Sequence, residues 1–373
     1  MRGRSVGAVF FGPAILLASS ALVHAEDQGR TLGFLAYDFN YYSAEANEEA
    51  CPDGLNTGAR DLFLGDQTDA ERERLLDPDN GNELRDALDR AIGSARDKPN
   101  ACTMPLDYKN YGLKTYQSAK HYGLNLDGVG STTEQTAAPN TCGHQNFVGF
   151  DGRSGIDNQM GRAVGCTRAY MRGGDFDNTT PATLIDGSYS VLIELRDVDD
   201  LQNDDEITVG FYSGQGTVML DPAGKILPYQ SLVTHENERF HNETKGKIVN
   251  GVVTTEPFDL HLEVHQQVIH SEHWIRAARF EGKLHDDGSM TGTVGGYYDL
   301  EKRWEHVTHA GVITSILTGY NCPGLYEAFQ KFADGFPDPE TGKCTAISSA
   351  MRVGAIPAFV IHEPYKAQTA QAE

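Results

Sequence analysis

Turn residues divide the middle of the chain into short apolar segments, and no other feature restricts the fold as strongly. Asn250-Gly251 separates two such segments and is the strongest short hairpin signal that a sequence offers. Four-residue turns at 221–224 and 286–289 separate two further pairs. Short strands at this spacing are typical of an antiparallel sandwich or barrel. Because strands and helices do not alternate here, a parallel doubly wound sheet is disfavoured.

Helical periodicity flanks this β region on both sides. Apolar residues recur at spacings of three and four in residues 82–96, and Thr68 and Glu71 have the spacing of a capping box that starts another helix. Beyond residue 300, the segments with helical patterns are 303–318, 323–333 and 345–353. We therefore expect an α+β protein whose antiparallel β core is sandwich-like.

The segment 1–25 has the three parts of a secretory signal peptide. Arg2 and Arg4 provide the positive start, residues 6–22 are mostly apolar, and small or apolar residues at 23 and 25 suit a signal peptidase. The apolar run is short for a spanning helix, and no other segment approaches the roughly 20 apolar residues that a span needs. We expect a periplasmic or secreted protein that does not span a membrane once its leader is removed.

The sequence thus predicts four regions. Residues 1–25 are the signal peptide, 26–135 an irregular and partly helical N-terminal region, 136–300 the β-rich core, and 301–373 a short helical C-terminal region with a frayed tail.

The charge balance restricts the partners. The chain has 31 basic and 53 acidic residues and a net charge of −22. Loss of Arg2 and Arg4 with the leader makes the mature charge about −24. A surface this acidic repels phosphate backbones, so nucleic acid is excluded as a partner. A small molecule, a carbohydrate or an envelope protein stays open as the partner.

Six cysteines predict three disulfides, because an even number in an exported chain is typical of a disulfide framework. They are Cys51, Cys102, Cys142, Cys166, Cys322 and Cys344. Their grouping two by two along the chain favours the pairs Cys51–Cys102, Cys142–Cys166 and Cys322–Cys344. The absence of C-x-x-C spacing argues against a thioredoxin-like site or a zinc ribbon.

A dense run of histidine is the first candidate metal site. On a strand, His261, Glu263 and His265 share one face, and Leu262 and Val264 share the other. Two imidazoles and a carboxylate on one face suit zinc or copper. The alternative is the solvated polar face of an amphipathic strand, and the run does not have the H-E-x-x-H order of metalloproteases.

A glycine-containing loop is the second candidate metal site. Asp151, Asp157 and Asn158 are short oxygen-bearing residues, and the glycines between them let a backbone curl around an ion. Such oxygen donors favour calcium over zinc or copper. The alternative is a set of ordinary turns, since the spacing does not match an EF-hand.

Three stretches resemble a group of exported proteobacterial proteins. They are CPDGLN at 51–56, YGLNLDG at 122–128 and GIDNQ at 155–159. The resemblance covers roughly residues 37–170 and implies a bacterial, exported protein. It implies no activity, ligand or catalytic residue.

The sequence leaves three hypotheses of function. It has no G-x-S-x-G elbow and no P-loop, which favours a non-enzymatic binding protein with calcium-stabilised acidic loops. One alternative is a metal-dependent enzyme that uses His261 and His265. The other alternative is a structural component of the cell envelope. Whether the protein is an enzyme stays open, because catalytic groups can assemble from distant residues.

Overall fold

A computed structural model describes residues 29–362, except 44, 46, 94–98, 131–137, 188 and 267–268. The expected signal peptide and the frayed tail lie outside the described residues. Only the backbone is described for residues 265, 266, 269, 312–314 and 316–318.

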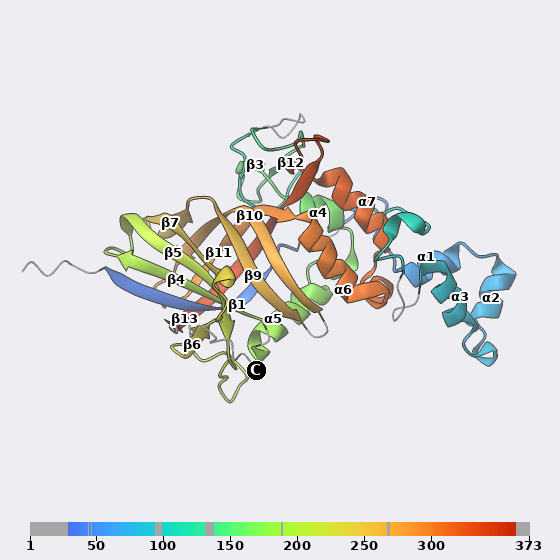
Figure 1. The fold of residues 1–373 in the computed structure, drawn as a ribbon, viewed down its shortest axis with the longest axis horizontal. Coiled ribbons are helices and arrows are strands. Elements are labelled where there is room, and N and C mark those ends of the chain that lie inside the picture. Colours follow the sequence, from blue (N-terminus) through green and yellow to red (C-terminus); the bar gives the residue numbers. More distant parts are fainter. Residues whose placement is uncertain are drawn as a thin grey trace, which may run out of the picture.

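Eight antiparallel strands form a closed barrel (Figure 1). Each strand pairs with the next barrel strand along the chain, and the last strand pairs with the first. The eight strands are β1 (Arg30–Tyr41), β4 (Ser190–Val198), β5 (Asn203–Gln215), β7 (His241–Val249), β8 (Val252–Thr255), β10 (Ile269–Leu284), β11 (Met290–Asp299) and β13 (Cys344–Ile361).

Shorter strands extend the barrel or lie beside it. The strand β6 pairs with β5 and, in parallel, with β13, while β9 pairs with β10 and β12 with β13. Two others, β2 and β3, form a separate ribbon. Their bounds are β2 (Phe147–Val148), β3 (Ser154–Ile156), β6 (Ser231–Thr234), β9 (Phe258–Gln266) and β12 (Gly335–Pro337).

The prediction of an α+β protein with an antiparallel core is confirmed, but the sandwich-like arrangement is wrong. The hairpins in residues 184–300 supply six neighbouring strands of the ring. The two remaining strands, β1 and β13, come from regions expected to be irregular or helical. Because these two strands pair with each other and with both ends of the hairpin series, they close the sheet into a barrel.

The segment 345–353 was expected to be helical and is part of β13. Its inward side chains include Ile347 and Met351, which lie in the main core. Its outward side chains include Ala346 and Ala350, which are small and also buried, because loops cover the outer face of the barrel there. A strand buried on both faces loses the apolar and polar alternation that identifies a strand in a sequence.

Side chains fill the barrel interior. On β1, Phe34 belongs to the interior core, and the next residue, Leu35, packs in a separate cluster on the outside. The ring centre of Phe211 lies 5.7 Å from that of Phe258 and 5.3 Å from that of Phe280. An eight-stranded barrel is just wide enough to be filled in this way. Sites for ligands are therefore to be sought at the ends and on the outer face.

Seven α-helices complete the described fold, and Figure 1 shows α1, α2 and α3 as a lobe beyond the end of the barrel. They are α1 (Ala59–Gly65), α2 (Asp69–Leu76), α3 (Glu83–Ile92), α4 (Gln159–Val164), α5 (Asp175–Asp186), α6 (Leu300–Thr318) and α7 (Cys322–Phe332). Short 3₁₀ turns occur at Pro78–Asn80, Pro105–Asp107, Arg168–Tyr170 and Glu238–Phe240. Within the described ranges, none of the helices has the length and apolar content of a transmembrane span.

The helices predicted at 68–76, 82–96, 303–318 and 323–333 are confirmed as α2, α3, α6 and α7. At the start of α2, the Thr68 side chain accepts a hydrogen bond from the backbone N–H of Glu71, as the capping-box spacing predicts. In α6, Gly311 has a φ of 67°, which interrupts the helix with a kink.

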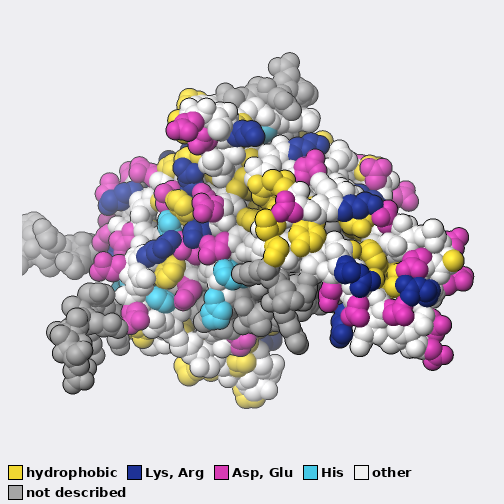
Figure 2. Space-filling view, turned by 45° about the vertical axis from the view of Figure 1, so that its right-hand side comes forward, with side chains coloured by type: hydrophobic (Ala, Val, Ile, Leu, Met, Phe, Trp, Pro, Cys, Tyr) yellow, Lys and Arg dark blue, Asp and Glu magenta, His cyan; other side chains and the backbone are white. Residues whose placement is uncertain are grey.

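Acidic side chains are spread over the surface. Figure 2 shows them on every part of the face that it presents, with histidines gathered over the barrel. This distribution agrees with the net charge of −22 and gives the surface a repulsive potential toward anionic polymers.

All six cysteines form disulfides, but the predicted pairing is wrong. The pairs are Cys51–Cys166, Cys102–Cys322 and Cys142–Cys344, with sequence separations of 115, 220 and 202 residues. The sequence grouping assumed that neighbouring cysteines pair, whereas the loops of the N-terminal half wrap around α7 and β13. Three disulfides indicate an oxidising, extracytoplasmic location.

Peptide mapping without reduction tests this connectivity. We expect protease digests analysed by mass spectrometry to contain linked peptides for the three observed pairs. Replacement of both Cys102 and Cys322 by Ser should lower the free energy of unfolding by about 2–4 kcal/mol, because the cross-link restricts the unfolded chain. Peptides that link Cys51 to Cys102 would contradict the observed pairing.

Candidate metal centre

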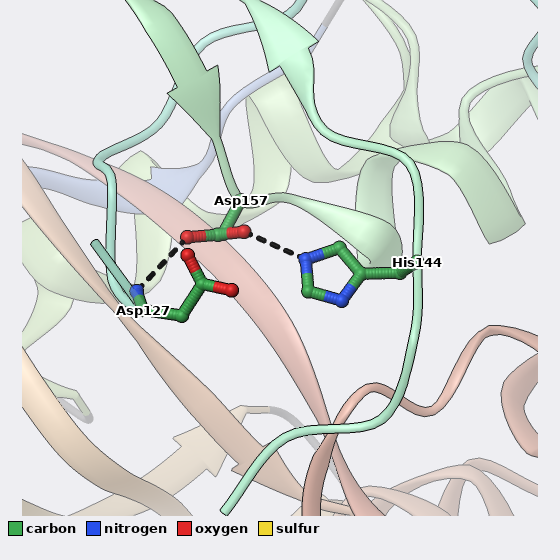
Figure 3. Close-up of side chains that lie close together, drawn as sticks. All are labelled: Asp127, His144 and Asp157. Atoms are coloured by element: carbon green, nitrogen blue, oxygen red, sulfur yellow. Dashed lines mark hydrogen bonds and ion pairs between the residues drawn. The ribbon is translucent and has the colours of Figure 1, made fainter. Parts of the chain in front are cut away.

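A partly buried group of ionisable side chains lies on the outer face of the barrel (Figure 3). Asp127, His144 and Asp157 each offer one ligand atom, and these three atoms lie within 4.8 Å of one another. Asp157 is fully buried, His144 is 6% exposed and Asp127 is half-buried. Among the described residues this is the group of three that could hold a metal ion.

The loop that carries Asp127 is pinned to the barrel wall by apolar contacts. Leu124 and Leu126 pack with Tyr297 of β11 and Ala346 of β13. The neighbouring residue Tyr298 points into the barrel, so Tyr297 necessarily points outward on the same strand. The loop therefore covers the outside of the sheet and brings Asp127 against it.

Asp157 occupies the centre of the group. Its backbone N–H donates to the carbonyl of Leu124 at 2.9 Å. One carboxylate oxygen accepts from the backbone N–H groups of Leu126 and Asp127, at 2.6 and 3.3 Å. Nearby, Gly155 has a φ of 75°, and a Cβ there would lie 2.3 Å from the carbonyl oxygen of Val129. Only glycine lets the two loops approach so closely.

His144 is held by both ring nitrogens. Nδ1 lies 2.8 Å from the carbonyl oxygen of Cys142, which can only accept, so Nδ1 carries a proton. Nε2 lies 2.9 Å from a carboxylate oxygen of Asp157 and 3.7 Å from one of Asp334. The disulfide from Cys142 to Cys344 ties this segment to β13.

Asp334 adds a third carboxylate next to this group. It is 1% exposed, and its Oδ1 accepts from the backbone N–H of Ser348 on β13 at 2.6 Å. Burial raises the pKa of Asp334 to about 7, although His144 and the Ser348 N–H act to lower it. The carboxyl is therefore partly protonated near neutral pH.

The neighbouring carboxylates change the pKa of the His144 imidazole. Burial alone would lower its pKa, but the hydrogen bond to Asp157 and the charge of Asp334 raise the pKa of His144 to about 9. Burial also raises the pKa of the Asp127 carboxyl. Without a bound cation, the group thus favours a protonated imidazole among carboxyl groups.

Several polar atoms of the group have no hydrogen-bond partner. They are Oδ2 of Asp127, Oδ2 of Asp334 and the hydroxyl of Tyr297, all buried. Burial of an unpaired polar atom costs about 1–3 kcal/mol. A cation between these oxygens would satisfy them, which is the structural reason to consider a metal ion here.

The donor set distinguishes between metals. Calcium takes six to eight oxygen ligands and rarely nitrogen, whereas zinc takes imidazole nitrogen and carboxylate oxygen in four-coordinate sites. With Nδ1–H donating to the Cys142 carbonyl, Nε2 of His144 is the nitrogen left for a metal, which is the usual arrangement of a metal-bound histidine. The group therefore fits zinc better than the calcium expected from the sequence.

The acidic loop predicted from the sequence contributes one residue to this group. Asp157 belongs to it, but Asp151 is exposed and pairs with Arg153 at 2.6 Å. Asn158 caps α4 by accepting from the Gly161 N–H, and its amide donates to the carbonyl of Tyr122. Of these three predicted residues, only Asp157 therefore belongs to the candidate metal centre.

The histidine run lies elsewhere, on the outside of β9. As predicted, Leu262 and Val264 are buried on the opposite face. His261 Nδ1 lies 2.6 Å from Glu272, and Glu263 lies 3.2 Å from His235. These are two separate histidine–carboxylate contacts rather than one convergent site. The side chain of His265 lies outside the described residues, so the prediction of a metal at this run stays a prediction.

The sequence interpretation missed His144, Asp127 and Asp334. A weak signal existed, because Asp127 and Asp157 lie in two of the stretches that carry the resemblance, 122–128 and 155–159. Nothing in the sequence joins them to Asp334, which lies far along the chain, after β11, α6 and α7.

The free energy of unfolding of the metal-free protein should fall as pH rises from 6.5 to 9. His144 has a folded pKa of about 9 against an ordinary 6.5, so its stabilisation is complete below pH 6.5 and disappears as pH passes 9. The pKa of Asp334 is raised from 3.8 to about 7. The stabilisation from this carboxyl therefore also decreases as pH rises, but mostly below this window. We expect a decrease of about 1–3 kcal/mol in urea titrations of chelator-treated protein.

His144→Gln should flatten this pH dependence, and His261→Gln, which removes a histidine paired with Glu272 outside the group, should leave it unchanged. A wild-type stability that rises between pH 6.5 and 9 would contradict the assignment.

Comparisons with protein-family models, with curated proteins and with solved structures found no match.

Proposed function

We propose that this chain is an exported, non-enzymatic metal-binding protein in which Asp127, His144 and Asp157 hold one divalent ion, with zinc as the best-fitting element. The observation that supports the proposal is the convergence of three ligand atoms within 4.8 Å on a partly buried site. Export is supported by the three disulfides and by the leader-like segment 1–25.

The charge of the group supports a cation. Asp127, Asp157 and Asp334 together carry three potential negative charges, and His144 supplies at most one positive charge. A buried excess of negative charge is unfavourable unless it is neutralised by protons or by a metal. A divalent ion would offset most of it, release the proton from His144 Nε2 and pair the free oxygens of Asp127 and Asp334.

The position of the group defines what the ion would do. Its ligands come from the loops on either side of β2 and β3, and Asp157 directly precedes α4. A bound ion would join these loops to each other over β11 and β13. Asp127 is the half-buried member, so we infer that the ion enters from its side.

Elemental analysis tests the proposal directly. We expect mature protein, purified without chelator or a histidine tag, to contain one zinc ion per chain. Isothermal titration of the chelator-treated protein with Zn²⁺ and with Ca²⁺ should show much tighter binding of Zn²⁺. Asp157→Asn and His144→Gln should each weaken Zn²⁺ binding at least tenfold, because each removes a ligand.

Asp151→Asn is the matched control, because Asp151 lies in the turn between β2 and β3 and outside the group. Its Zn²⁺ affinity should equal that of the wild type. Calcium in place of zinc would favour the acidic-loop hypothesis instead, and a protein that binds neither ion would end the proposal.

A groove supports a second candidate function, the binding of a small molecule or a carbohydrate. It has a volume of about 570 Å³ and lies between the start of α6, α7 and the turn before β13. The rings of Trp304 and Tyr326 meet edge to face in it, 5.0 Å apart. Glu301 and Glu340 are among its polar lining residues. Aromatic rings with carboxylates around them suit sugar rings or cationic groups.

The two tryptophans of the chain make this candidate easy to test. In a Trp274→Phe variant, Trp304 is the only source of tryptophan fluorescence. Titration with a panel of disaccharides, and separately with choline, should change that fluorescence in a saturable way for one class. Tyr326→Ala should weaken the response, and a fluorescence that no probe changes would contradict a role for the groove with these two classes.

The hypotheses of a metal-dependent enzyme at His261 and His265 and of a structural envelope component stay predictions.

A further inference from the structure

An arginine lies buried at the end of the barrel that faces the helices. Arg303, in the first turns of α6, is 1% exposed. Its guanidinium carbon lies 5.5 Å from the ring centre of Tyr41 and 5.9 Å from that of Tyr298. One of its terminal N–H groups donates to the hydroxyl of Tyr170. The arginine is therefore enclosed by aromatic side chains from β1, β11 and the loop before α5.

The charge of this arginine has no ionised partner among the described residues. The groups that act on it most strongly are tyrosines, not carboxylates: Tyr170, Tyr41, Tyr298 and Tyr320. Burial raises the pKa of Tyr41 to about 12 and raises that of Tyr298 further, so these hydroxyls are neutral near pH 7. The guanidinium thus carries an uncompensated positive charge in a nonpolar setting, which is strongly unfavourable.

Two histidines near Arg303 add no charge to the site. His273 and His306 are buried beside it, with ring centres 6.4 Å apart. Burial and the nearby guanidinium lower the pKa of His273 to about 3 and lower that of His306 as well. Both imidazoles are neutral at physiological pH.

Unused hydrogen-bond donors gather at the same place. Nε and Nη1 of Arg303 are buried and have no hydrogen-bond partner. The hydroxyl of Tyr189 is also buried without a partner. The hydroxyl of Tyr41 lies near that of Tyr298 but forms no hydrogen bond of normal geometry. Buried donors of this kind are rare in native proteins and usually indicate a bound water or ion.

A small cavity lies against Arg303 and Tyr41. Its volume is about 20 Å³, and its lining includes Tyr41, Arg303 and the two histidines. Asn40 and Thr180 add polar side chains. The cavity is large enough for one water-sized particle and too small for a carboxylate, sulfate or phosphate ion.

We propose that this cavity binds a chloride ion, which pairs with Arg303 and accepts hydrogen bonds from its Nε and Nη1. A single water molecule would satisfy the donors but would leave the positive charge unpaired. Chloride is only slightly larger than water, accepts hydrogen bonds from several directions and carries the one negative charge that the site lacks. The ion would fix α6 against the end of the barrel.

Stability measurements at constant ionic strength test this proposal. The mature protein is unfolded with urea in mixtures of sodium chloride and sodium gluconate, whose anion is too large for the cavity. We expect the free energy of unfolding to rise with chloride, approaching about 1.4 kcal/mol for each tenfold increase above the dissociation constant. Crystals grown in sodium bromide should show an anomalous peak within hydrogen-bond distance of Arg303.

Variants separate a bound ion from general salt effects. Arg303→Met keeps the length of the side chain without its charge and should abolish the chloride dependence. Tyr41→Phe should weaken that dependence if its hydroxyl contributes to the site. The matched control is Tyr212→Phe. The hydroxyl of Tyr212 donates to Glu243 outside the main core, so this variant should retain the full chloride dependence. If Arg303→Met does not fold, the bromide peak decides alone.

Three results would overturn the proposal. The first is equal stability in chloride and in gluconate. The second is a bromide map without a peak in the cavity. The third is tyrosinate absorbance at 295 nm near pH 7, since a deprotonated tyrosine would then be the counter-ion.

Discussion

The pairing of β1 with β13 is the contact on which the rest of the structure depends. Gly33 lies opposite Ala358 and Tyr41 opposite Met351, so strands from the two ends of the described chain meet side by side. Because the ring closes there, the core residues of all eight strands are sealed from water. The same strand β13 also carries the cysteine that anchors the His144 segment and the backbone N–H that holds Asp334. The strand that closes the barrel therefore also positions the candidate metal centre.

The two centres of buried charged side chains have an excess of opposite charge. One lies on the outer face of the barrel and the other at the barrel end. Outside the barrel, Asp127, Asp157 and Asp334 surround a single imidazole, and negative charge is in excess. At the barrel end, Arg303 is surrounded by neutral aromatic groups, and positive charge is in excess. Neither centre is balanced by protein groups alone. A bound cation at the first centre and a bound anion at the second would each offset the unfavourable charge there. Only the closed barrel brings together the complete set of ligand atoms at each centre, so both ions would favour this one fold.

The sequence predicted what local patterns encode and missed what depends on distant contacts. The hairpins at Asn250-Gly251 and at 286–289, the capped helix at Thr68 and the alternation in β9 follow from residues close in sequence, and these were found. The segments around the predicted turn at 221–224 form only an isolated bridge between Leu220 and Ile226. The strand β13 was mistaken for a helix because Ala346 and Ala350 are small where the outer loops cover them. The candidate metal centre was missed because His144 and Asp334 meet only after the loops have packed on the barrel. Asp157 was noticed as a loop carboxylate, but its partners could not be read from its neighbours.

The connectivity of the disulfides has a consequence for how the chain matures. A polypeptide emerges from the ribosome, or from an export channel, with its N-terminus first, so Cys51 and Cys102 are available together long before their native partners. An oxidant that acts as the cysteines appear would join consecutive ones, and in this protein every such bond is non-native. Correct maturation therefore needs either oxidation that waits for the complete chain or a disulfide isomerase that rearranges early errors.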